Sequence, residues 1–479
     1  MTFTSFEFLL FFPAVVLLYN FIPQKMRLWY LLAISYAFYA LMQPVYLLLL
    51  TSVTGVTYGI TRWMGRTEDD DKKKRQMVWG IILVLLPLFF FKYFNFVNES
   101  ILGLLSGVGL NITIPAVKWM LPVGISFYTF MAIGYIVDVY NEEVDVERNI
   151  GSVGLFLSFF PYILSGPIER AGNMFPQFKS FKNSTYDDLV SGFKLLMLGY
   201  FMKLCVADRL GLYVDTIFAD IAGSTGKSLT FATLLYPFQV YADLGGYSIM
   251  AMGAARSMGL KIIPNFRRPF FATSMSELWR RWHMSLITWL TDYIYTPLSF
   301  ALRSWKVWGI VCALMLTFLI SGIWHGAALT FIVWGLVQGI YLSIEALLQK
   351  KRSSFESKHN LNAKWWYVLL CCFFVYLLFT FSQIFGRCAT VSDALSVIGK
   401  IFAFDGPIEF GDKHNLLYVA ISLIILFAFD FKNEYLPKLR ISPFSSKYWI
   451  VRYVSFIVLI VYILVFGAIG NSQFIYFQF

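Results

Sequence analysis

The chain has 479 residues, of which 58% are hydrophobic, 19% are aromatic and only 14% are charged. A soluble domain carries about 25% charged residues, so this composition excludes an ordinary water-soluble surface and predicts a membrane protein. The net charge of +11 does not indicate nucleic-acid binding, because the basic residues fall in short loops between apolar runs. The five cysteines form no CxxC pair and the four histidines are few, so we predict neither a disulfide framework nor a metal site.

Apolar segments recur along the whole chain, and a spanning helix needs roughly 20 such residues. We predict them at residues 6–22, 28–42, 45–61, 79–97, 119–138, 151–166, 191–207, 229–252, 286–303, 308–324, 327–349, 366–386, 415–431 and 449–469. The fold class is therefore predicted as an all-α polytopic membrane protein. We expect about 11 transmembrane helices, with re-entrant and interfacial helices around a central tunnel.

Two of these segments contain residues that disfavour a regular helix. The predicted breaks are at Pro161, Gly166 and Pro167 in the first, and at Pro237, Gly245 and Gly246 in the second. Irregular backbone at membrane depth survives only where protein or a water-filled cavity satisfies it, so both segments are predicted to line a cavity. We find no inverted repeat of the kind from which many secondary transporters are built.

The loops indicate an orientation in the membrane. The loop at 256–281 carries six basic residues and one acid, and the loop at 350–364 is also basic. Cytoplasmic loops carry such an excess of Lys and Arg. Both loops are therefore predicted to face the cytoplasm.

The densest run of unusual residues is PNFRRPFFATSMSELWRRWHMSLITWLTDYIYTP, residues 264–297. Ser274 followed by Glu277 matches a capping box, which predicts a helix that begins near Met275. A helix at this place would enter the membrane surface among aromatic and basic side chains.

Continued as a helix, this run would place Trp279 and His283 four residues apart on one face, with Arg280 and Arg281 pointing elsewhere. Aromatic belts and snorkelling arginines are ordinary at membrane interfaces. The residues by themselves therefore leave both a functional and an anchoring role open for His283.

A second run, SGIWHGAALTFIVWG at residues 321–335, places His325 between two strongly apolar stretches. Ionisable groups at membrane depth are costly and usually face a cavity or a partner. The small neighbours Gly322, Gly326 and Ala327 would let another helix or a substrate approach the ring. We predict a functional role for His325.

WRRWHMSL and GIWHGAALTFIVWG resemble the paired signature blocks of the membrane-bound O-acyltransferase family. The resemblance is to the bacterial branch that contains alginate O-acetylation and teichoic-acid D-alanylation proteins. Further blocks agree in order along essentially the whole chain: SYAFYALMQPVYLLLL, FFFKYFNF, LPVGISFYTFMAIGYIVDVY, FFPYILSGPIERAGNMFPQF, YADLGGYSIMAMG and FIYFQF. The chain departs from alginate-type relatives at Ala242, Gly245 and Leu329, which leaves the substrate less constrained than the reaction.

The resemblance implies a site and a domain organisation. His325 matches the catalytic histidine, and His283 matches the second histidine, which could orient the donor or donate to the developing oxyanion. Candidate substrate or donor contacts are Trp279, Arg280, Arg281, Trp282, Trp324 and Asp243. Residues 1–479 are expected to form one integral-membrane acyltransferase domain, with a core at about 119–349. Peripheral helices would occupy 1–118 and 350–479.

Two further groups of residues keep alternative roles at this point. Glu169 and Asp243 could hydrogen-bond the histidines or the backbone, or cap and line the site. The arginines of the basic loop could meet the phosphates of coenzyme A or an acidic carrier protein, although the positive-inside bias explains them equally well. They are Arg267, Arg268, Arg280 and Arg281.

The resemblance also implies substrates and partners. The expected donor is a cytoplasmic thioester, either acetyl-CoA or an acyl-carrier protein, with no bound cofactor and no metal. The expected acceptor is a hydroxyl of an extracytoplasmic polysaccharide, reached directly or through a partner of the SGNH-hydrolase type. Membrane lipids surround the chain, which is expected to be multi-pass in the bacterial cytoplasmic (inner) membrane. No nucleic-acid partner is expected.

Acetyl is the expected acyl group, because the length and the extended C-terminal third resemble the alginate-type branch. Three alternatives remain at this stage: D-alanyl transfer to a cell-envelope polymer, a transporter or flippase for a glycan or lipid-linked intermediate, and a non-catalytic scaffold for a polysaccharide synthesis complex. A flippase would move its substrate without consuming thioester.

Overall fold

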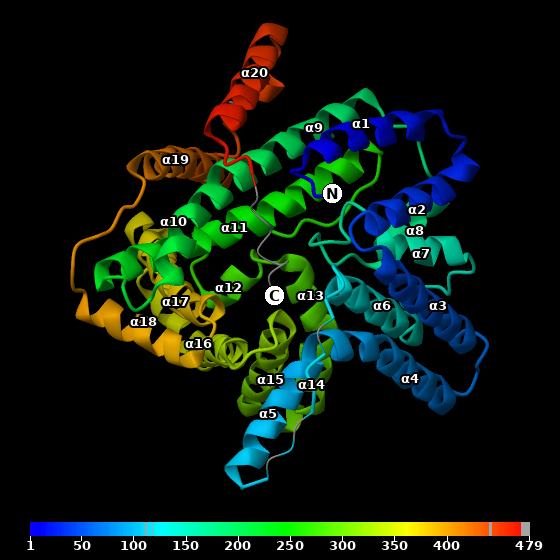
Figure 1. The fold of residues 1–479 in the computed structure, drawn as a ribbon, viewed down its shortest axis with the longest axis horizontal. Coiled ribbons are helices and arrows are strands. Elements are labelled where there is room, and N and C mark those ends of the chain that lie inside the picture. Colours follow the sequence, from blue (N-terminus) through cyan, green and yellow to red (C-terminus); the bar gives the residue numbers. More distant parts are fainter. Residues whose placement is uncertain (111, 113, 118, 440–442, 471–479) are drawn as a thin grey trace. The chain divides into compact units, whose positions relative to one another are not determined.

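The computed structural model describes the chain except residues 111, 113, 118, 440–442 and 471–479. All regular secondary structure in this described part is helical (Figure 1). Eight helical stretches in it are long and apolar enough to cross a membrane. They are Pro44–Met64, Asp70–Gly107, Tyr186–Ala219, Val307–His325, Leu329–Lys358, Trp365–Arg387, Lys413–Tyr435 and Trp449–Phe466. An all-α polytopic membrane protein is thus confirmed, while the count of about 11 crossings and the tunnel stay predictions.

The chain divides into two compact units. The first comprises Met1–Phe193 and Ala251–Ile263, and the second comprises Lys194–Met250 and Pro264–Phe479. The first unit contains α1 (Phe6–Phe21), α2 (Gln24–Ala40), α3 (Leu47–Met64), α4 (Asp70–Leu88), α5 (Phe94–Gly107), α6 (Ile125–Tyr140), α7 (Ile150–Ser158) and α8 (Ala171–Lys179). Two helices contribute residues to both units, α9 (Tyr186–Tyr200) and α11 (Gly226–Ser257).

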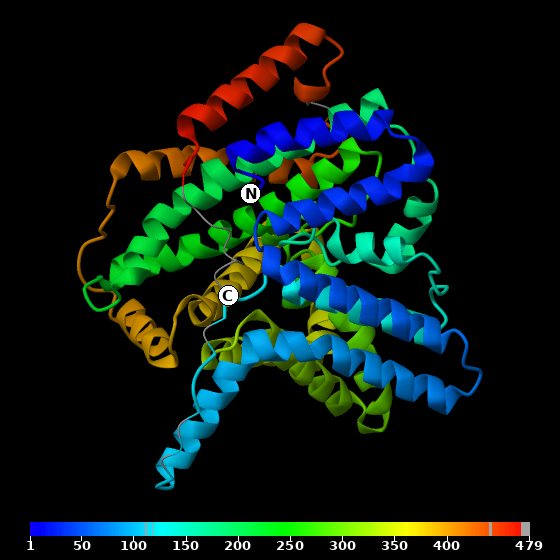
Figure 2. The same cartoon turned by 45° about the vertical axis from the view of Figure 1, so that its right-hand side comes forward.

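The remaining helices belong to the second unit. They are α10 (Asp208–Ala219), α12 (Met275–Trp279), α13 (Met284–Leu290), α14 (Thr296–Ala301), α15 (Val307–His325), α16 (Leu329–Lys358), α17 (Trp365–Arg387), α18 (Val391–Ala403), α19 (Lys413–Tyr435) and α20 (Trp449–Phe466). Of these, α15 and α16 form a tightly packed hairpin, with α17 against α16 (Figures 1 and 2).

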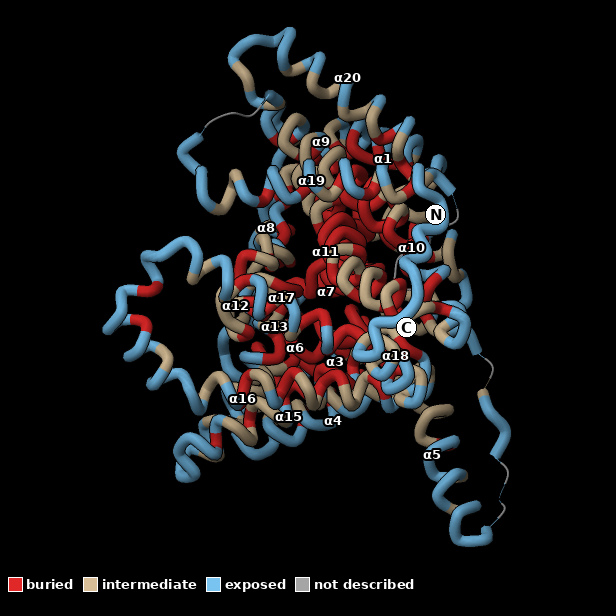
Figure 3. The backbone as a smooth tube through the Cα atoms, turned by 90° about the vertical axis from the view of Figure 1, so that its left-hand side faces the viewer, coloured by how far each residue is buried: buried red, intermediate tan, exposed pale blue. Residues whose placement is uncertain are grey.

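In the first unit, α6 is the central helix. It packs against α3, α4 and α7 (Figures 1 and 2), and nearly every residue from Ile125 to Val139 is buried. A helix that is apolar on all sides is one that neighbours enclose. The burial of each residue shows the same difference between helices. Helices α6 and α7 are largely buried, while α5 and α20 are mostly exposed (Figure 3). In a membrane protein the exposed apolar helices are those that lipid would cover.

The break predicted in the segment 151–166 is confirmed. Helix α7 ends at Ser158, and the chain then runs through turns and irregular backbone to residue 170. Side chains supply partners here, since the backbone N–H of Phe160 donates to Ser35 Oγ at 3.1 Å. The hydroxyl of Tyr162 donates to the carbonyl of Phe156 at 2.7 Å. Protein atoms thus satisfy the irregular backbone, as burial requires.

The break predicted in the segment 229–252 is wrong. Pro237 and both glycines lie inside α11, which runs without interruption from Gly226 to Ser257. The glycines permit close packing instead: a Cβ on Gly246 would lie 3.1 Å from the carbonyl oxygen of Gly199. Small residues let membrane helices approach closely, and prolines are tolerated in such helices when neighbours satisfy the backbone.

The capping box at the start of α12 is confirmed, but the shared helical face is wrong. Ser274 Oγ accepts the backbone N–H of Glu277 at 3.1 Å, and α12 begins at Met275. The helix ends at Trp279, and His283 adopts a left-handed conformation, φ 46° and ψ 49°, directly before α13. The chain therefore turns between the two side chains, and the spacing rule for one continuous helix does not apply.

Candidate active site

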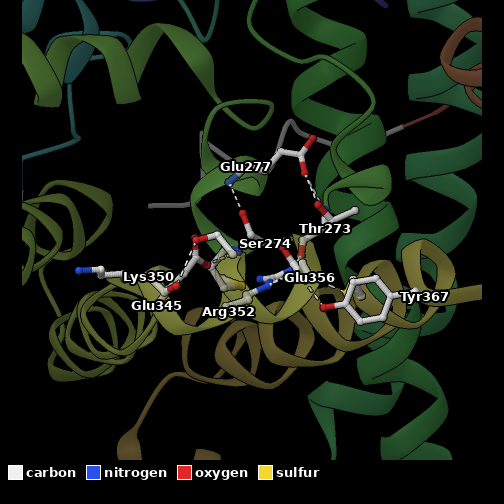
Figure 4. Close-up of polar contacts among 11 residues, drawn as sticks. Thr273, Ser274, Glu277, Glu345, Lys350, Arg352, Glu356 and Tyr367 are labelled. Atoms are coloured by element: carbon white, nitrogen blue, oxygen red, sulfur yellow. Dashed lines mark hydrogen bonds and ion pairs between the residues drawn. The ribbon is translucent and has the colours of Figure 1, made fainter. Parts of the chain in front are cut away.

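Helix α12 is held in place by polar contacts at its N-terminus. Glu345 of α16 accepts the backbone N–H of Met275 at 2.8 Å and that of Ser276 at 3.3 Å. Figure 4 shows this carboxylate beside Ser274 and, on the same side, Arg352 donating to the carbonyl of Thr273 at 2.9 Å. Carboxylates stabilise helix N-termini by satisfying N–H groups that lack partners in the helix. Short α12 is thereby fixed against α16.

At the other end of α12, the Trp279 indole is buried and anchored. Its Nε1–H donates to Gln338 Oε1 at 3.3 Å, and Gln338 in turn donates to Ser382 Oγ at 2.6 Å. The Trp279 ring packs edge-on against Trp334, with ring centroids 5.8 Å apart. A buried indole N–H needs such a partner, so this contact sets the orientation of the ring. Trp279 therefore connects α12 to α16 and α17.

His283 lies in a closed polar cluster directly before α13. The ring is 3% exposed, and its Nδ1 lies 3.1 Å from Oδ1 of Asn265. The same oxygen accepts the backbone N–H of Ser285 at 3.2 Å and its hydroxyl at 2.8 Å. Burial lowers the pKa of His283 to about 3, although its own backbone carbonyl works in the opposite direction. The imidazole is therefore neutral at physiological pH.

His325 is the last residue of α15, and its ring is half-buried among aromatic side chains. The ring centroid lies 4.8 Å from that of Trp324 and 4.9 Å from that of Trp334, both edge-on. Gly322, one turn earlier, allows α16 to approach, because a Cβ there would lie 3.2 Å from the Cα of Gly335. The small residues predicted to admit another helix or a substrate thus admit α16 on this side.

Trp324 brings the two predicted histidines into one cluster. Its ring centroid lies 6.0 Å from that of His283 and 4.8 Å from that of His325. Trp334 then extends the cluster to Trp279. The sequence runs 264–297 and 321–335, which were singled out separately, therefore meet in space. We call this group, His283, Trp324, His325, Trp334 and Trp279, the histidine–tryptophan cluster.

Trp282 is buried next to this cluster and shares neighbours with it, since Phe379 also contacts Trp279 and Phe266 also contacts His283. Its ring centroid lies 4.8 Å from that of Phe379 and 5.2 Å from that of Phe266. Tyr241, whose hydroxyl donates to Asp430 at 2.9 Å, lies 6.3 Å away, centroid to centroid. Trp282 is therefore packed among aromatic side chains directly before His283.

The two neighbouring arginines differ in their surroundings. Arg281 is paired with Glu277 at 2.6 Å and with Glu434 at 3.0 Å, and Glu434 also pairs with Arg268 at 3.2 Å. Burial would lower the pKa of Arg281, but the two carboxylates raise it above its usual value. Arg280 is exposed, and no ion pair joins it to another residue within the described part of the chain. Of this pair, Arg280 is therefore the exposed residue and Arg281 the one held in ion pairs.

Asp243 of α11 lies in a buried charge cluster with Lys203 and with Asp208 of α10. Its carboxylate is 2.5 Å from Lys203 Nζ, and Asp208 is 2.7 Å from the same nitrogen. All three side chains are almost fully buried. Glu169, in the first unit, accepts the backbone N–H of Arg170 at 3.2 Å and also that of Ile263, and burial raises its pKa. Of the roles considered for Glu169, the structure therefore shows hydrogen bonding to backbone N–H groups.

A cavity of about 600 Å³ lies beside α12. Its walls come from residues 273–275, α16 and α17 and are mainly apolar, with Glu345, Arg352 and Tyr367 as polar members. Neither His283 nor His325 lines it. The cavity therefore does not correspond to the predicted central tunnel, and it is separate from the histidine–tryptophan cluster.

Sequence reasoning missed three residues that shape this region. Asn265 holds His283, Gln338 holds Trp279, and Lys203 holds Asp243. Lys203 had a visible signal, since a lysine within an apolar run is costly unless paired. Asn265 and Gln338 gave no signal in the sequence, because a single amide in such a segment can equally be a simple capping or lining group.

Comparisons with known proteins agree with this arrangement. Residues 149–388 match the model of the MBOAT, membrane-bound O-acyltransferase family, a stretch that contains both histidines. A probable alginate O-acetylase of Pseudomonas putida is 32% identical over the full length of both chains. A probable alginate O-acetylase of Pseudomonas syringae pv. tomato is 38% identical over 72% of this chain and 66% of its own length.

A teichoic acid D-alanyltransferase of Streptococcus thermophilus is 31% identical over 50% of this chain and 61% of its own length. The similarity to alginate-type proteins thus extends over the whole chain, whereas that to the D-alanylation protein is confined to half of it. The chain is an O-acyltransferase that belongs to the membrane-bound O-acyltransferase family.

Proposed function

We propose that the protein transfers an acetyl group from a cytoplasmic thioester to a hydroxyl of an extracytoplasmic polysaccharide, or to a partner that delivers it there. The observation that carries this proposal is the histidine–tryptophan cluster, in which two histidines from distant segments share contact with Trp324. Full-length similarity to probable alginate O-acetylases supports acetyl over D-alanyl.

His325 is the proposed general base. A hydroxyl is a poor nucleophile at neutral pH, and a neutral imidazole can take its proton during attack. The hydroxyl oxygen then bonds to the acyl carbon, the carbon–sulfur bond breaks, and the imidazolium returns the proton to the leaving thiolate. General-base catalysis of this kind contributes about 10²–10⁴-fold to the rate. The half-buried ring at the end of α15 combines access with partial exclusion of water.

The donor side is proposed at the basic loop. Arg280 is exposed and without an ion pair in the described residues, and phosphate groups of coenzyme A or of a carrier-protein prosthetic group would be attracted to it. Arg268 and Arg281 have their charges balanced by Glu434 and Glu277. The proposed partners are therefore a cytoplasmic donor, which is acetyl-CoA or an acyl-carrier protein, and an extracytoplasmic SGNH-hydrolase-like protein. The proposed location is the bacterial cytoplasmic membrane.

The experiment compares the surface glycans of cells that carry the gene, lack it, or carry His325→Ala. Mass spectrometry should find O-acetyl groups only with the wild-type gene, while the variant remains folded and inserted in the membrane fraction. His359→Ala is the matched control, because His359 is an exposed histidine of the same unit. Normal O-acetylation in the His325 variant would refute the assignment, and an unchanged glycan in gene-lacking cells would refute polysaccharide acetylation.

A further inference from the structure

Asn265 lies at the centre of the polar cluster that holds His283. The side chain is 2% exposed, and its Oδ1 faces His283 Nδ1 at 3.1 Å, the backbone N–H of Ser285 at 3.2 Å and the Ser285 hydroxyl at 2.8 Å. Its backbone carbonyl accepts the N–H of Met284 at 2.8 Å. One residue thus contacts His283, directly before α13, and the first two residues of α13.

The orientation of the Asn265 amide follows from these contacts. A backbone N–H can only donate, so the amide atom that faces Ser285 N must be the oxygen. On its other side, Nδ2 donates to Ser248 Oγ at 3.1 Å, a contact that the hydroxyl can accept. The atom in front of His283 Nδ1 is therefore an acceptor that carries no hydrogen.

This orientation determines the tautomer of His283. Because Oδ1 cannot donate, the hydrogen of the contact must lie on Nδ1. A neutral imidazole carries one N–H, so Nε2 then holds a lone pair. Burial keeps the ring neutral by lowering its pKa to about 3. The left-handed backbone of His283, φ 46°, is a conformation that persists at functional sites when the surroundings hold it.

We infer that Asn265 is a positioning residue that fixes His283 in the Nδ1–H tautomer, so that Nε2 serves the reaction as a hydrogen-bond acceptor. The role of Nε2 in the reaction rests on the proposed acyl transfer. The tautomer of His283 does not depend on that proposal. It excludes one of the two roles considered for His283, donation to the developing oxyanion, because Nε2 has no hydrogen to give. The role that remains is orientation, in which Nε2 accepts a hydrogen bond from the group that it orients.

The tautomer can be measured without any activity. The chain has only four histidines, so ¹⁵N-histidine labelling gives a simple solid-state NMR spectrum of the protein in lipid bilayers at pH 7. The His283 signals are assigned by their loss in His283→Asn. We expect an unprotonated Nε2 and a protonated Nδ1 for His283. A protonated Nε2 would overturn the inference, whatever the protein's activity.

Two variants and one control test the role of Asn265. Asn265→Asp keeps an acceptor oxygen, so it should preserve the tautomer, whereas Asn265→Leu removes the acceptor and should populate Nε2–H. Ser248→Ala is the control, because Ser248 contacts the amide nitrogen and not Oδ1. An unchanged tautomer in folded Asn265→Leu would contradict the inference, and the wild-type spectrum remains decisive if that variant does not fold.

The kinetic signature separates positioning from a purely structural effect. In detergent-solubilised protein with acetyl-CoA as the donor, Asn265→Leu should lower kcat by about 10²-fold or more, since a histidine in the wrong tautomer loses its role. The donor KM should stay unchanged, and Asn265→Asp should recover most of kcat. Equal loss in Asn265→Leu and Asn265→Asp would contradict the inference.

Discussion

The two histidines of the cluster both contact Trp324, yet their surroundings differ. His283 is enclosed by a network of polar hydrogen bonds that centres on Asn265. His325 ends a helix and is held by aromatic edges, with its ring half-buried. A polar network fixes the protonation state and direction of a ring, whereas edge-on aromatic packing fixes its place. This difference agrees with the proposal that His283 has an orienting role and that His325 transfers the proton.

The buried charge cluster gives the largest expected effect and tests how costly a broken polar network is in this fold. Lys203→Met would leave Asp243 and Asp208 without their cation. Removing one partner of a buried ion pair costs about 3–5 kcal/mol, so we expect a large drop in melting temperature in detergent. Asp243 would then count as a structural residue. An unchanged melting temperature combined with lost activity would return Asp243 to the candidate site.

The two histidines should differ in stability when each is replaced by alanine. His283→Ala removes a buried ring together with its hydrogen bond to Asn265. Such a bond contributes about 0.5–1.5 kcal/mol, and the cavity left by the ring adds to the loss. His325→Ala removes a ring that is only half-buried, so we expect a loss below about 1 kcal/mol. Thermal unfolding of the two variants in the same detergent measures the difference. Equal losses would remove the distinction between a polar and an aromatic setting.

The neutral state of His283 predicts a pH dependence of stability. Its pKa is about 3 in the fold and about 6.5 in an unfolded chain. The unfolded state therefore binds more protons between these values, and stability falls as the pH falls. From pH 6 to pH 5 the loss from this residue should be about 1 kcal/mol.

The measurement is the stability of the wild type as a function of pH minus that of His283→Gln. The subtraction cancels the contributions of the other titrating groups. Glu169 is one of these, since burial raises its pKa and a carboxyl shifted in that direction gains stability as the pH falls. A difference curve that is flat between pH 6 and pH 5 would contradict a neutral His283.

The two neighbouring arginines should differ from each other both in their effect on stability and in their effect on donor binding. Arg280→Ala changes an exposed side chain, so we expect a stability change within about 0.5 kcal/mol and a raised KM for the thioester donor. Arg281→Ala breaks charge-assisted bonds to Glu277 and Glu434, which should cost about 1.5–3 kcal/mol with the donor KM nearly unchanged. Steady-state kinetics and melting curves of both variants check this. A donor KM that rises in Arg281→Ala alone would reverse the assignment.

Much of this fold can be predicted from the sequence because apolar length is a strong signal in membranes. Each segment predicted from residue 6 to residue 469 contains a helix or the start of one. The failure at Pro237, Gly245 and Gly246 has a physical cause. Proline and glycine mark breaks in water-soluble helices, but within packed membrane helices glycines serve close approach, as Gly246 does against Gly199.

The candidate site could be predicted in part. An ionisable residue between apolar runs identified His325, and the motifs identified His283, but no pattern shows that Trp324 would bring them together. Asn265 was missed because a single amide becomes informative only through the groups that it contacts. The helical spacing of Trp279 and His283 misled for a related reason, since the helix ends at Trp279 and the following turn is set by tertiary contacts.

The most direct test of the central claim is the consumption of a thioester. Membranes that contain the wild-type protein, the polysaccharide acceptor and any required partner should release free coenzyme A, or free carrier protein, together with an O-acetylated product. His325→Ala membranes should release it slower by about 10²–10⁴-fold, at equal protein content. Wild-type rates of thioester consumption and product formation in His325→Ala, or glycan movement without thioester consumption in the wild type, would contradict the account.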